Sequence, residues 1–90
     1  MIDSRFQLVL DDIDAAIASR KAGKWSASNA AIDDARTKLT DIAEESPGLA
    51  IMSFILMALN HLDKALDYPD FSYLSLARST VERASKVAHA

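Results

Sequence analysis

The stretch that most constrains the fold of this chain runs from Leu49 to Leu59. Only Ser53 interrupts this apolar run, so the segment has almost no polar side before Asn60. A helix that is apolar all round has to be buried somewhere. The run is shorter than the roughly 20 residues needed to cross a bilayer. We therefore expect other parts of the chain, or another chain, to cover it.

Length and composition favour one small helical domain spanning residues 1–90. Half of the residues are hydrophobic, about a quarter are charged, and there are only 2 Gly and 2 Pro. The net charge of −3 gives no general attraction to nucleic acid or to anionic membranes. The N-terminal residues lack the basic and apolar regions of a signal peptide. These features predict a cytoplasmic protein that does not associate with membranes.

Apolar residues recur at every third or fourth position in four segments, which is the period of one face of a helix. The clearest stripe comprises Phe6, Val9, Ile13, Ala16 and Arg20. The predicted helices span about 4–22, 27–45, 47–67 and 71–88. Gly23 is placed to end the first helix in a left-handed conformation. The expected N-caps of the next three helices are Ser26 or Ser28, Ser46 ahead of Pro47, and Asp70.

Four helices with short connections predict an all-α, compact antiparallel four-helix bundle. The third helix should be its most buried element, because its apolar groups lie on every side. The other three helices have thin, alanine-rich stripes that look too small to cover it. Either the third helix is central, with three helices around it, or its extra face is buried between subunits. We favour a homodimer or larger assembly with an interface made by Ile51, Met52, Phe54, Ile55 and Met57.

In such a bundle the first and third connections lie at the same end, where four of the six aromatic residues gather. Trp, Tyr and Arg are the residue types that dominate binding hot spots. This aromatic pole is the predicted partner-binding site. Its alternative role is a hydrophobic plug that closes the bundle, with Trp25 folded over the third helix. The predicted partner-binding residues are Lys21, Lys24, Trp25, Tyr68, Phe71 and Tyr73.

Several kinds of chemistry lack their residues here. The chain has no cysteine, which excludes disulfides, thiol nucleophiles and cysteine-rich zinc sites. The acidic pairs, such as Asp11-Asp12, are adjacent, so their side chains diverge by about 100° on a helix. With only 2 Gly, a glycine-rich phosphate loop is not possible. We therefore predict no catalytic residues, no metal site and no cofactor.

Two catalytic alternatives rest on the histidines. His61, in LNHLDKAL, invites comparison with histidine phosphotransfer bundles, although Asp63 would repel a phosphoryl group. Arg83 and His89 have the arginine–histidine spacing of HEPN ribonucleases, which are also helical bundles. His89 is next to the last residue of the sequence, where a fixed catalytic base is not expected.

Taken together, these observations predict a small non-enzymatic helical interaction protein that forms a homo-oligomer and binds another macromolecule. An adaptor, an assembly factor and a phage-type or mobile-element inhibitor of a host complex all fit this description. A protein partner is expected rather than nucleic acid, because the second helix carries Asp33, Asp34 and Asp41 on its outer face. The alternative is a minimal catalytic bundle of the HEPN or phosphotransfer kind.

Overall fold

The computed structural model describes residues 4–88, which form four α-helices and, within that range, no strand. The helices are α1 (Ser4–Lys21), α2 (Trp25–Glu44), α3 (Leu49–Asp67) and α4 (Ser72–Ala88). The predicted all-α four-helix fold is confirmed.

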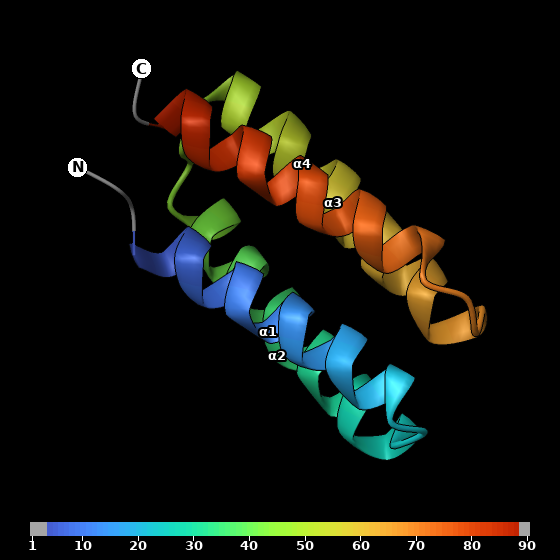
Figure 1. Cartoon of the computed structure of the whole chain (residues 1–90). Helices are drawn as coiled ribbons and strands as arrows, with labels where there is room; N and C mark the ends of the chain where they lie inside the picture. The colour runs from blue at the N-terminus through green and yellow to red at the C-terminus, as the bar shows by residue number, and fades with distance from the viewer. Residues whose placement is uncertain (1–3, 89–90) are drawn as a thin grey trace.

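The helices are arranged as two antiparallel hairpins packed side by side (Figure 1). α1 packs closely on α2 and α3 on α4, while α1–α4 and α2–α3 contacts join the two hairpins. The backbones of the diagonal pairs, α1 with α3 and α2 with α4, do not come within 8 Å of each other, measured between Cα atoms. The start of α1, the end of α4 and the connection 45–48 lie at one end, and the other two connections lie at the opposite end. This is the up-down-up-down bundle that short connections predict.

The core is built from one stripe of each helix, as the sequence spacing predicts. In α1 the stripe includes Phe6, Val9 and Ile13, all of which are almost completely buried. Most of the remaining core is aliphatic or alanine, and the small residues let neighbouring helices approach closely. The other core residues are Leu10, Ala16, Ile32, Ala35, Leu39, Ile42, Ile55, Ala58, Leu62, Ala65, Leu74, Ala77, Val81 and Ala84.

The prediction that α3 is the most buried helix is wrong. Its buried residues are only Ile55, Ala58, Leu62 and Ala65, which is a narrower stripe than α1 buries. In a square bundle each helix touches two neighbours and turns its remaining side to water, however apolar that side is. The apolar side chains on the outer side of α3 are therefore not covered by this chain.

The end of α1 is set by Gly23, as predicted. Gly23 has a φ of 75°, a left-handed conformation that glycine adopts without steric cost. The backbone N–H of Lys24 donates to the carbonyl of Ser19 (2.8 Å), and that of Gly23 donates to the carbonyl of Arg20 (3.1 Å). These two bonds form a Schellman motif, which satisfies carbonyls that the helix end would otherwise leave free.

The predicted N-caps of α2 are wrong. The helix begins at Trp25, and Lys24 occupies the N-cap position without a side-chain capping bond. Ser28 instead lies inside the helix, fully buried, where its Oγ donates to the carbonyl of Ala16 at 2.9 Å. Its small size and this hydrogen bond hold α1 and α2 close together, so the residue serves packing instead of capping.

The predicted start of α3 at Pro47 is also wrong, whereas Asp70 behaves as predicted. Ser46 ends α2 with a φ of 52°, and Gly48 is the N-cap residue of α3 with a φ of 104°. The N–H of Ser46 donates to the carbonyl of Ala43 at 3.1 Å, so Ser46 belongs to the end of α2 and does not cap α3. At the other connection, the Oδ1 of Asp70 accepts a hydrogen bond from the N–H of Ser72 at 3.1 Å.

Candidate interaction surfaces

The outer face of α3 is an exposed apolar surface, which we define by Leu49, Met52, Ser53, Leu56 and Met57. The side chain of Leu49 is 91% exposed, that of Leu56 58% and that of Met57 47%. Met52 is half-buried, and Ser53 is exposed, with its hydroxyl bonded back to the carbonyl of Leu49. Large apolar side chains gathered on one side of a helix are typical of an interaction site.

The predicted interface residues divide between this surface and the interior. Met57 is exposed, and Ile51, Met52 and Phe54 are half-buried. Ile55 is fully buried, so its assignment to an interface between subunits is wrong. It lies three residues before the buried Ala58 and seven before Leu62, and this spacing turns it to the core.

Sequence reasoning missed Leu49 and Leu56, which are the most exposed of the large apolar residues of α3. Two polar residues of α3, Ser53 and Asn60, could have identified them from the sequence. Ser53 lies four residues after Leu49, and Asn60 lies four after Leu56, so all four share one line along the helix. Since Ser53 and Asn60 face water, that line had to be the outer one.

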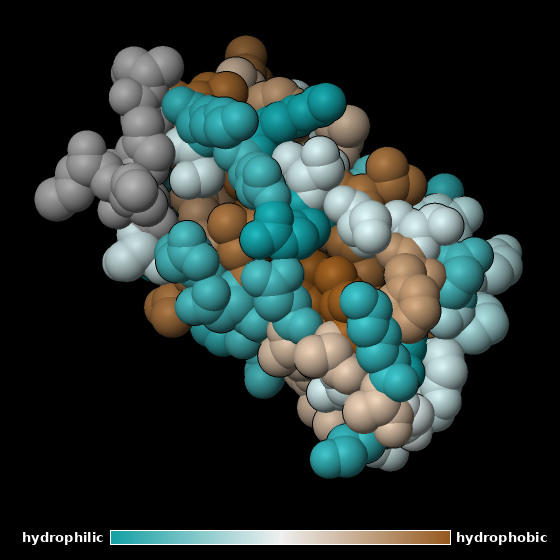
Figure 2. Space-filling model, viewed as in Figure 1, coloured by the Kyte–Doolittle hydropathy of each residue, from teal (hydrophilic) through white to brown (hydrophobic). Residues whose placement is uncertain are grey.

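Figure 2 views the side formed by α1 and α4, where hydrophilic side chains are interspersed with paler and hydrophobic ones. Brown, hydrophobic side chains emerge at its upper rim, where Figure 1 shows the start of α3. By length and composition α3 could cross a membrane, and no other helix in residues 4–88 could; about 22% of its apolar window is buried in the bundle. The apolar part of α3 is therefore only partly covered, and Leu49, Leu56 and Met57 remain exposed on it.

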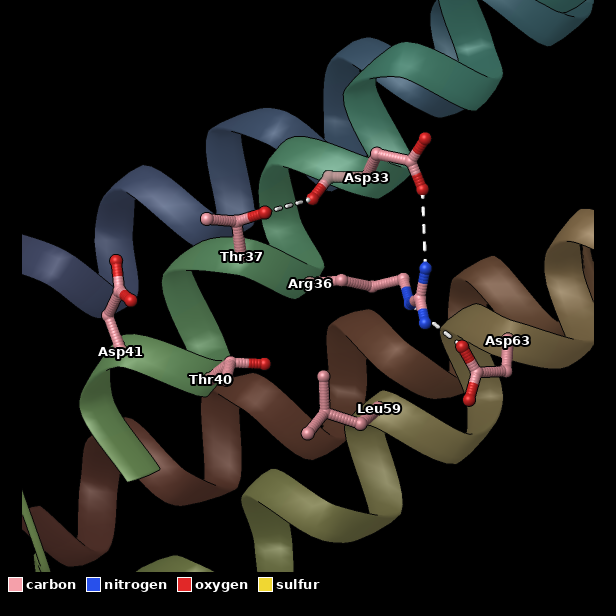
Figure 3. A pocket seen from close by; sticks show the side chains of 7 residues that line it. All are labelled: Asp33, Arg36, Thr37, Thr40, Asp41, Leu59 and Asp63. Carbon is pink, nitrogen blue, oxygen red and sulfur yellow. Dashed lines mark hydrogen bonds and ion pairs between the residues drawn. The ribbon is translucent and has the colours of Figure 1, made fainter. Parts of the chain in front are cut away.

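Beside this surface, α2 and α3 border an open hollow of about 410 Å³ whose lining includes three acidic residues and Arg36 (Figure 3). Arg36 crosses it to form ion pairs with Asp63 on α3 (2.8 Å) and Asp33 on its own helix (3.3 Å). Within residues 4–88, no group of three or more potential ligand side chains could hold a metal ion. The hollow is lined by Asp33, Arg36, Thr37, Thr40, Asp41, Leu59 and Asp63.

The aromatic pole forms at the end where the connections α1–α2 and α3–α4 meet. At its centre Arg20 is only 4% exposed. Its guanidinium donates to the carbonyls of Ala65 (2.8 Å), Asp70 (3.2 Å) and Tyr68 (3.3 Å). It also lies over the ring of Trp25, 5.0 Å from the centroid. Arg20 thus joins the end of α1 to the carboxyl end of α3.

Two further cations lie over aromatic rings at this pole. Lys21 is 6.0 Å from the ring centre of Phe71, and Lys64 is 5.7 Å from that of Tyr73. The rings of Tyr68 and Tyr73 are 5.5 Å apart and tilted by 37°. All the predicted partner-binding residues therefore lie around these two connections.

The pole is partly open to solvent. Trp25, Tyr68 and Phe71 each keep more than a third of their side chain exposed, and Tyr73 is half-buried. Lys21 and Lys24 are exposed. Trp25 packs on the guanidinium of Arg20, so the ring covers a buried charge while one side faces water. Burial lowers the pKa of Arg20 and the nearby Asp70 carboxylate opposes that shift, but arginine remains charged at any physiological pH.

The surroundings of the histidines do not resemble those of a catalytic base. His61 is half-buried, and its Nδ1 is buried without a hydrogen-bond partner among the described residues. A catalytic base needs a partner that fixes its orientation. Arg83 is exposed on α4, whereas His89 lies outside the described residues.

Comparison of the chain with protein-family models, with curated proteins and with solved structures gives no match.

Proposed function

We propose that this chain is a small helical interaction protein that self-associates through the outer face of α3 and binds another protein at its aromatic pole. The single observation that supports this proposal best is the exposure of large apolar side chains on α3, led by Leu49 and Leu56. Apolar surface removed from water stabilises an interface by about 25 cal/mol per Å². A polar residue at these positions would suit an isolated bundle better.

The chemistry of the surface suits an interface that can adapt. Met52 and Met57 flank the two leucines, and methionine side chains are flexible and polarizable enough to fill irregular gaps. The aromatic pole supplies a second, different surface, with half-exposed rings held beside cations. Such amphipathic rings are common anchors at interfaces between proteins.

The test of self-association is the mass in solution, measured by size-exclusion chromatography with light scattering. Wild type should elute at a multiple of 9.8 kDa. Leu56→Asp should elute at 9.8 kDa with its helical circular dichroism intact. Leu8→Asp is the matched control, because Leu8 on α1 is 50% exposed and lies outside this surface. A monomeric wild type, or equal masses for both variants, would remove the basis of the proposal.

The test of the aromatic pole is an affinity capture from the native cell with wild type and Trp25→Ala. We expect a specific protein to be captured by wild type and by Leu8→Ala and to be lost with Trp25→Ala. Helicity and the unfolding midpoint should be measured for each variant. Capture that is unchanged in Trp25→Ala would show that the pole only closes the end of the bundle.

A further inference from the structure

We infer that the occupant of the outer face of α3 is a second copy of this chain, related by a two-fold axis that runs along α3. In this dimer the acidic side of α2 in one copy faces the basic side of α4 in the other. The inference rests on the proposed self-association through α3 and adds the relative orientation of the copies and the charges that select it.

Contacts within the bundle show which neighbour lies on each side of the outer face. Asp63 pairs with Arg36 of α2, and Lys64 lies over Tyr73 of α4. Leu56 precedes Asp63 by two helical turns, so it leans toward α2. Met57 precedes Lys64 by the same interval, so it leans toward α4. The outer face therefore lies between α2 on one side and α4 on the other.

The exposed charges differ in sign on these two sides. Asp41 and Glu44 lie exposed near the end of α2, and Arg83 lies exposed near the end of α4. Lys86 is also exposed but lies toward α1, because it follows by four residues Glu82, the partner of Arg78. No salt bridge involves any of the four within residues 4–88. α2 and α4 run antiparallel to α3, with Arg36 beside Asp63 and Tyr73 beside Lys64. Counting from these two contacts, the four charged residues lie level with the apolar run 49–59 of α3.

In a two-fold symmetric dimer, the direction of the axis decides which charged residues of the two copies face each other. An axis along α3 exchanges the two sides, so Glu44 of each copy faces Arg83 of the other. An axis across α3 keeps the sides, so acid faces acid and base faces base. Opposed like charges are strongly disfavoured at interfaces. A two-fold interface must also be self-complementary, because each copy offers the same patch.

A second copy fits the surface better than a lipid bilayer does. The apolar part of the outer face ends at Asn60, and Asp63 and Asp67 follow on α3. The acidic residues of α2 would lie against the head groups and would be repelled by anionic lipid. A partner with one acidic and one basic side, like this chain, satisfies both sides of the surface.

The charge arrangement can be tested by reversing it, with the dimer dissociation constant measured by sedimentation equilibrium. Glu44→Lys should weaken the dimer about tenfold, because each substitution acts twice in a symmetric dimer. Glu44→Lys combined with Arg83→Glu should restore the constant to within about threefold of wild type. Asp11→Lys is the control, since Asp11 is exposed on α1, which lies diagonally opposite α3 in the bundle.

The orientation can be tested independently by cross-linking, because the chain has no cysteine of its own. Ser53 and Asn60 are exposed and lie on one line along α3, two turns apart. With the axis along α3, Ser53→Cys and Asn60→Cys should each form a disulfide with its own counterpart on oxidation. With the axis across α3, at most one of them can do so, because only residues on the axis meet themselves. Ala15→Cys on α1, which is exposed, should not cross-link.

The outcomes separate this inference from the proposed function. If Leu56→Asp dissociates the dimer while Glu44→Lys behaves like Asp11→Lys, self-association through α3 stands and the orientation is wrong. The same holds if only one cysteine variant cross-links. If wild type is a monomer that binds vesicles of phosphatidylcholine and phosphatidylserine, both are overturned, and the surface belongs to a membrane.

Discussion

Arg20 is the residue that ties the aromatic pole together. Its position at the end of the apolar stripe of α1 buries the guanidinium, and three backbone carbonyls on the α3–α4 hairpin accept its hydrogen bonds. A buried charge is tolerated only when it is hydrogen-bonded in this way. The side chain thus acts as a C-terminal cap of α3 supplied by a different helix.

Replacing Arg20 by methionine should destabilise the fold by about 2–3 kcal/mol, because the carbonyls of Ala65, Tyr68 and Asp70 would lose a charged donor. The measurement is urea unfolding followed by circular dichroism. Lys24→Met is the control: Lys24 is exposed, and its loss should change stability by less than about 0.5 kcal/mol. Equal midpoints for the two variants would mean that water replaces the guanidinium at no cost.

Two helices are followed by a residue in the left-handed conformation: α1 by Gly23 and α2 by Ser46. Gly23 occupies its left-handed conformation without strain, whereas Ser46 adopts a φ of 52° although it carries a Cβ. Pro47 follows Ser46 and has no N–H, so it cannot complete a Schellman motif at the end of α2. The turn 45–48 is therefore the more strained of the two.

Opposite substitutions at these positions should have opposite effects on thermal unfolding. Gly23→Ala should cost about 1–2 kcal/mol from the left-handed backbone alone, since an added Cβ would meet nothing within 4 Å. Ser46→Gly should stabilise the protein by roughly 0.5–1 kcal/mol, because it relieves that strain. A lower melting temperature for Ser46→Gly would show that the seryl side chain stabilises the turn.

The helix α3 has two apolar faces, one buried in the core and one exposed to solvent. Ile55 is fully buried and its neighbour Leu56 is 58% exposed, although both are large aliphatic residues in one apolar run. The geometry of the helix alone separates them, since successive side chains point about 100° apart. This pair offers a direct comparison of core and surface.

We expect Ile55→Asp to unfold the protein, because an unpaired carboxylate would enter the core at a cost of several kcal/mol. Leu56→Asp should keep full helicity and alter only the association state. Circular dichroism and light scattering on the two variants distinguish these effects. Unfolding of both variants would indicate that the monomer is not stable without its partner.

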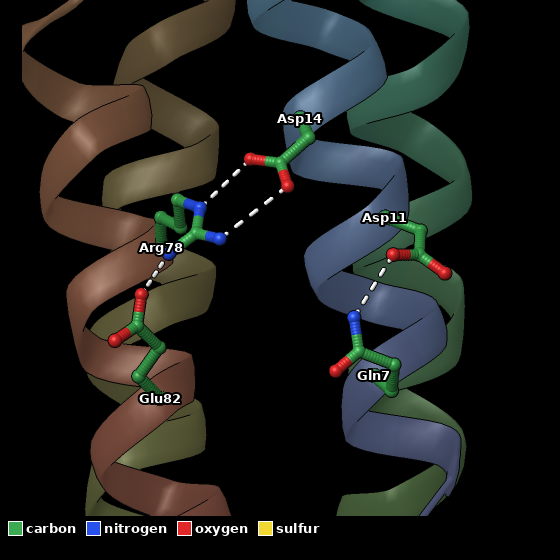
Figure 4. A network of polar contacts seen from close by, with 5 residues as sticks. All are labelled: Gln7, Asp11, Asp14, Arg78 and Glu82. Carbon is green, nitrogen blue, oxygen red and sulfur yellow. Dashed lines mark hydrogen bonds and ion pairs between the residues drawn. The ribbon is translucent and has the colours of Figure 1, made fainter.

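At the scale of the whole molecule, polar pairs join the two hairpins on both sides of the bundle. Arg78 of α4 forms two hydrogen bonds to Asp14 of α1, at 2.7 and 3.4 Å, and also pairs with Glu82 (Figure 4). The bond to Asp14 raises the pKa of Arg78, against a smaller opposing effect of burial. On the other side of the bundle, Arg36 joins α2 to α3.

A double-mutant cycle on Asp14→Asn and Arg78→Gln should give a coupling free energy of about 0.2–1 kcal/mol, the usual range for exposed pairs. Both side chains are 40% exposed or more, so solvent screens their attraction. Urea unfolding of the four proteins provides the value. A coupling free energy above about 2 kcal/mol would show that solvent does not screen this pair and that it contributes strongly to the stability of the bundle.

Much of the fold could be predicted from the sequence because it depends on local spacing. The stripes that contain Phe6 and Ile32 are regular enough to define helices and their inner faces, and Gly23 and Asp70 mark helix ends through their own backbone or side-chain chemistry. Short connections then leave few arrangements of four helices. The gathering of aromatic residues at one pole follows from that arrangement.

Other features depended on tertiary structure. Nothing in the local pattern states that Ser28 would be buried against Ala16, or that Arg20 would reach the carbonyls of α3, because those partners belong to other helices. The sequence determined that α3 is apolar on nearly every side. Only the square packing of the bundle decided that Ile55 faces the core while Leu49 and Leu56 face outward, because each helix has two neighbours and cannot bury its remaining side.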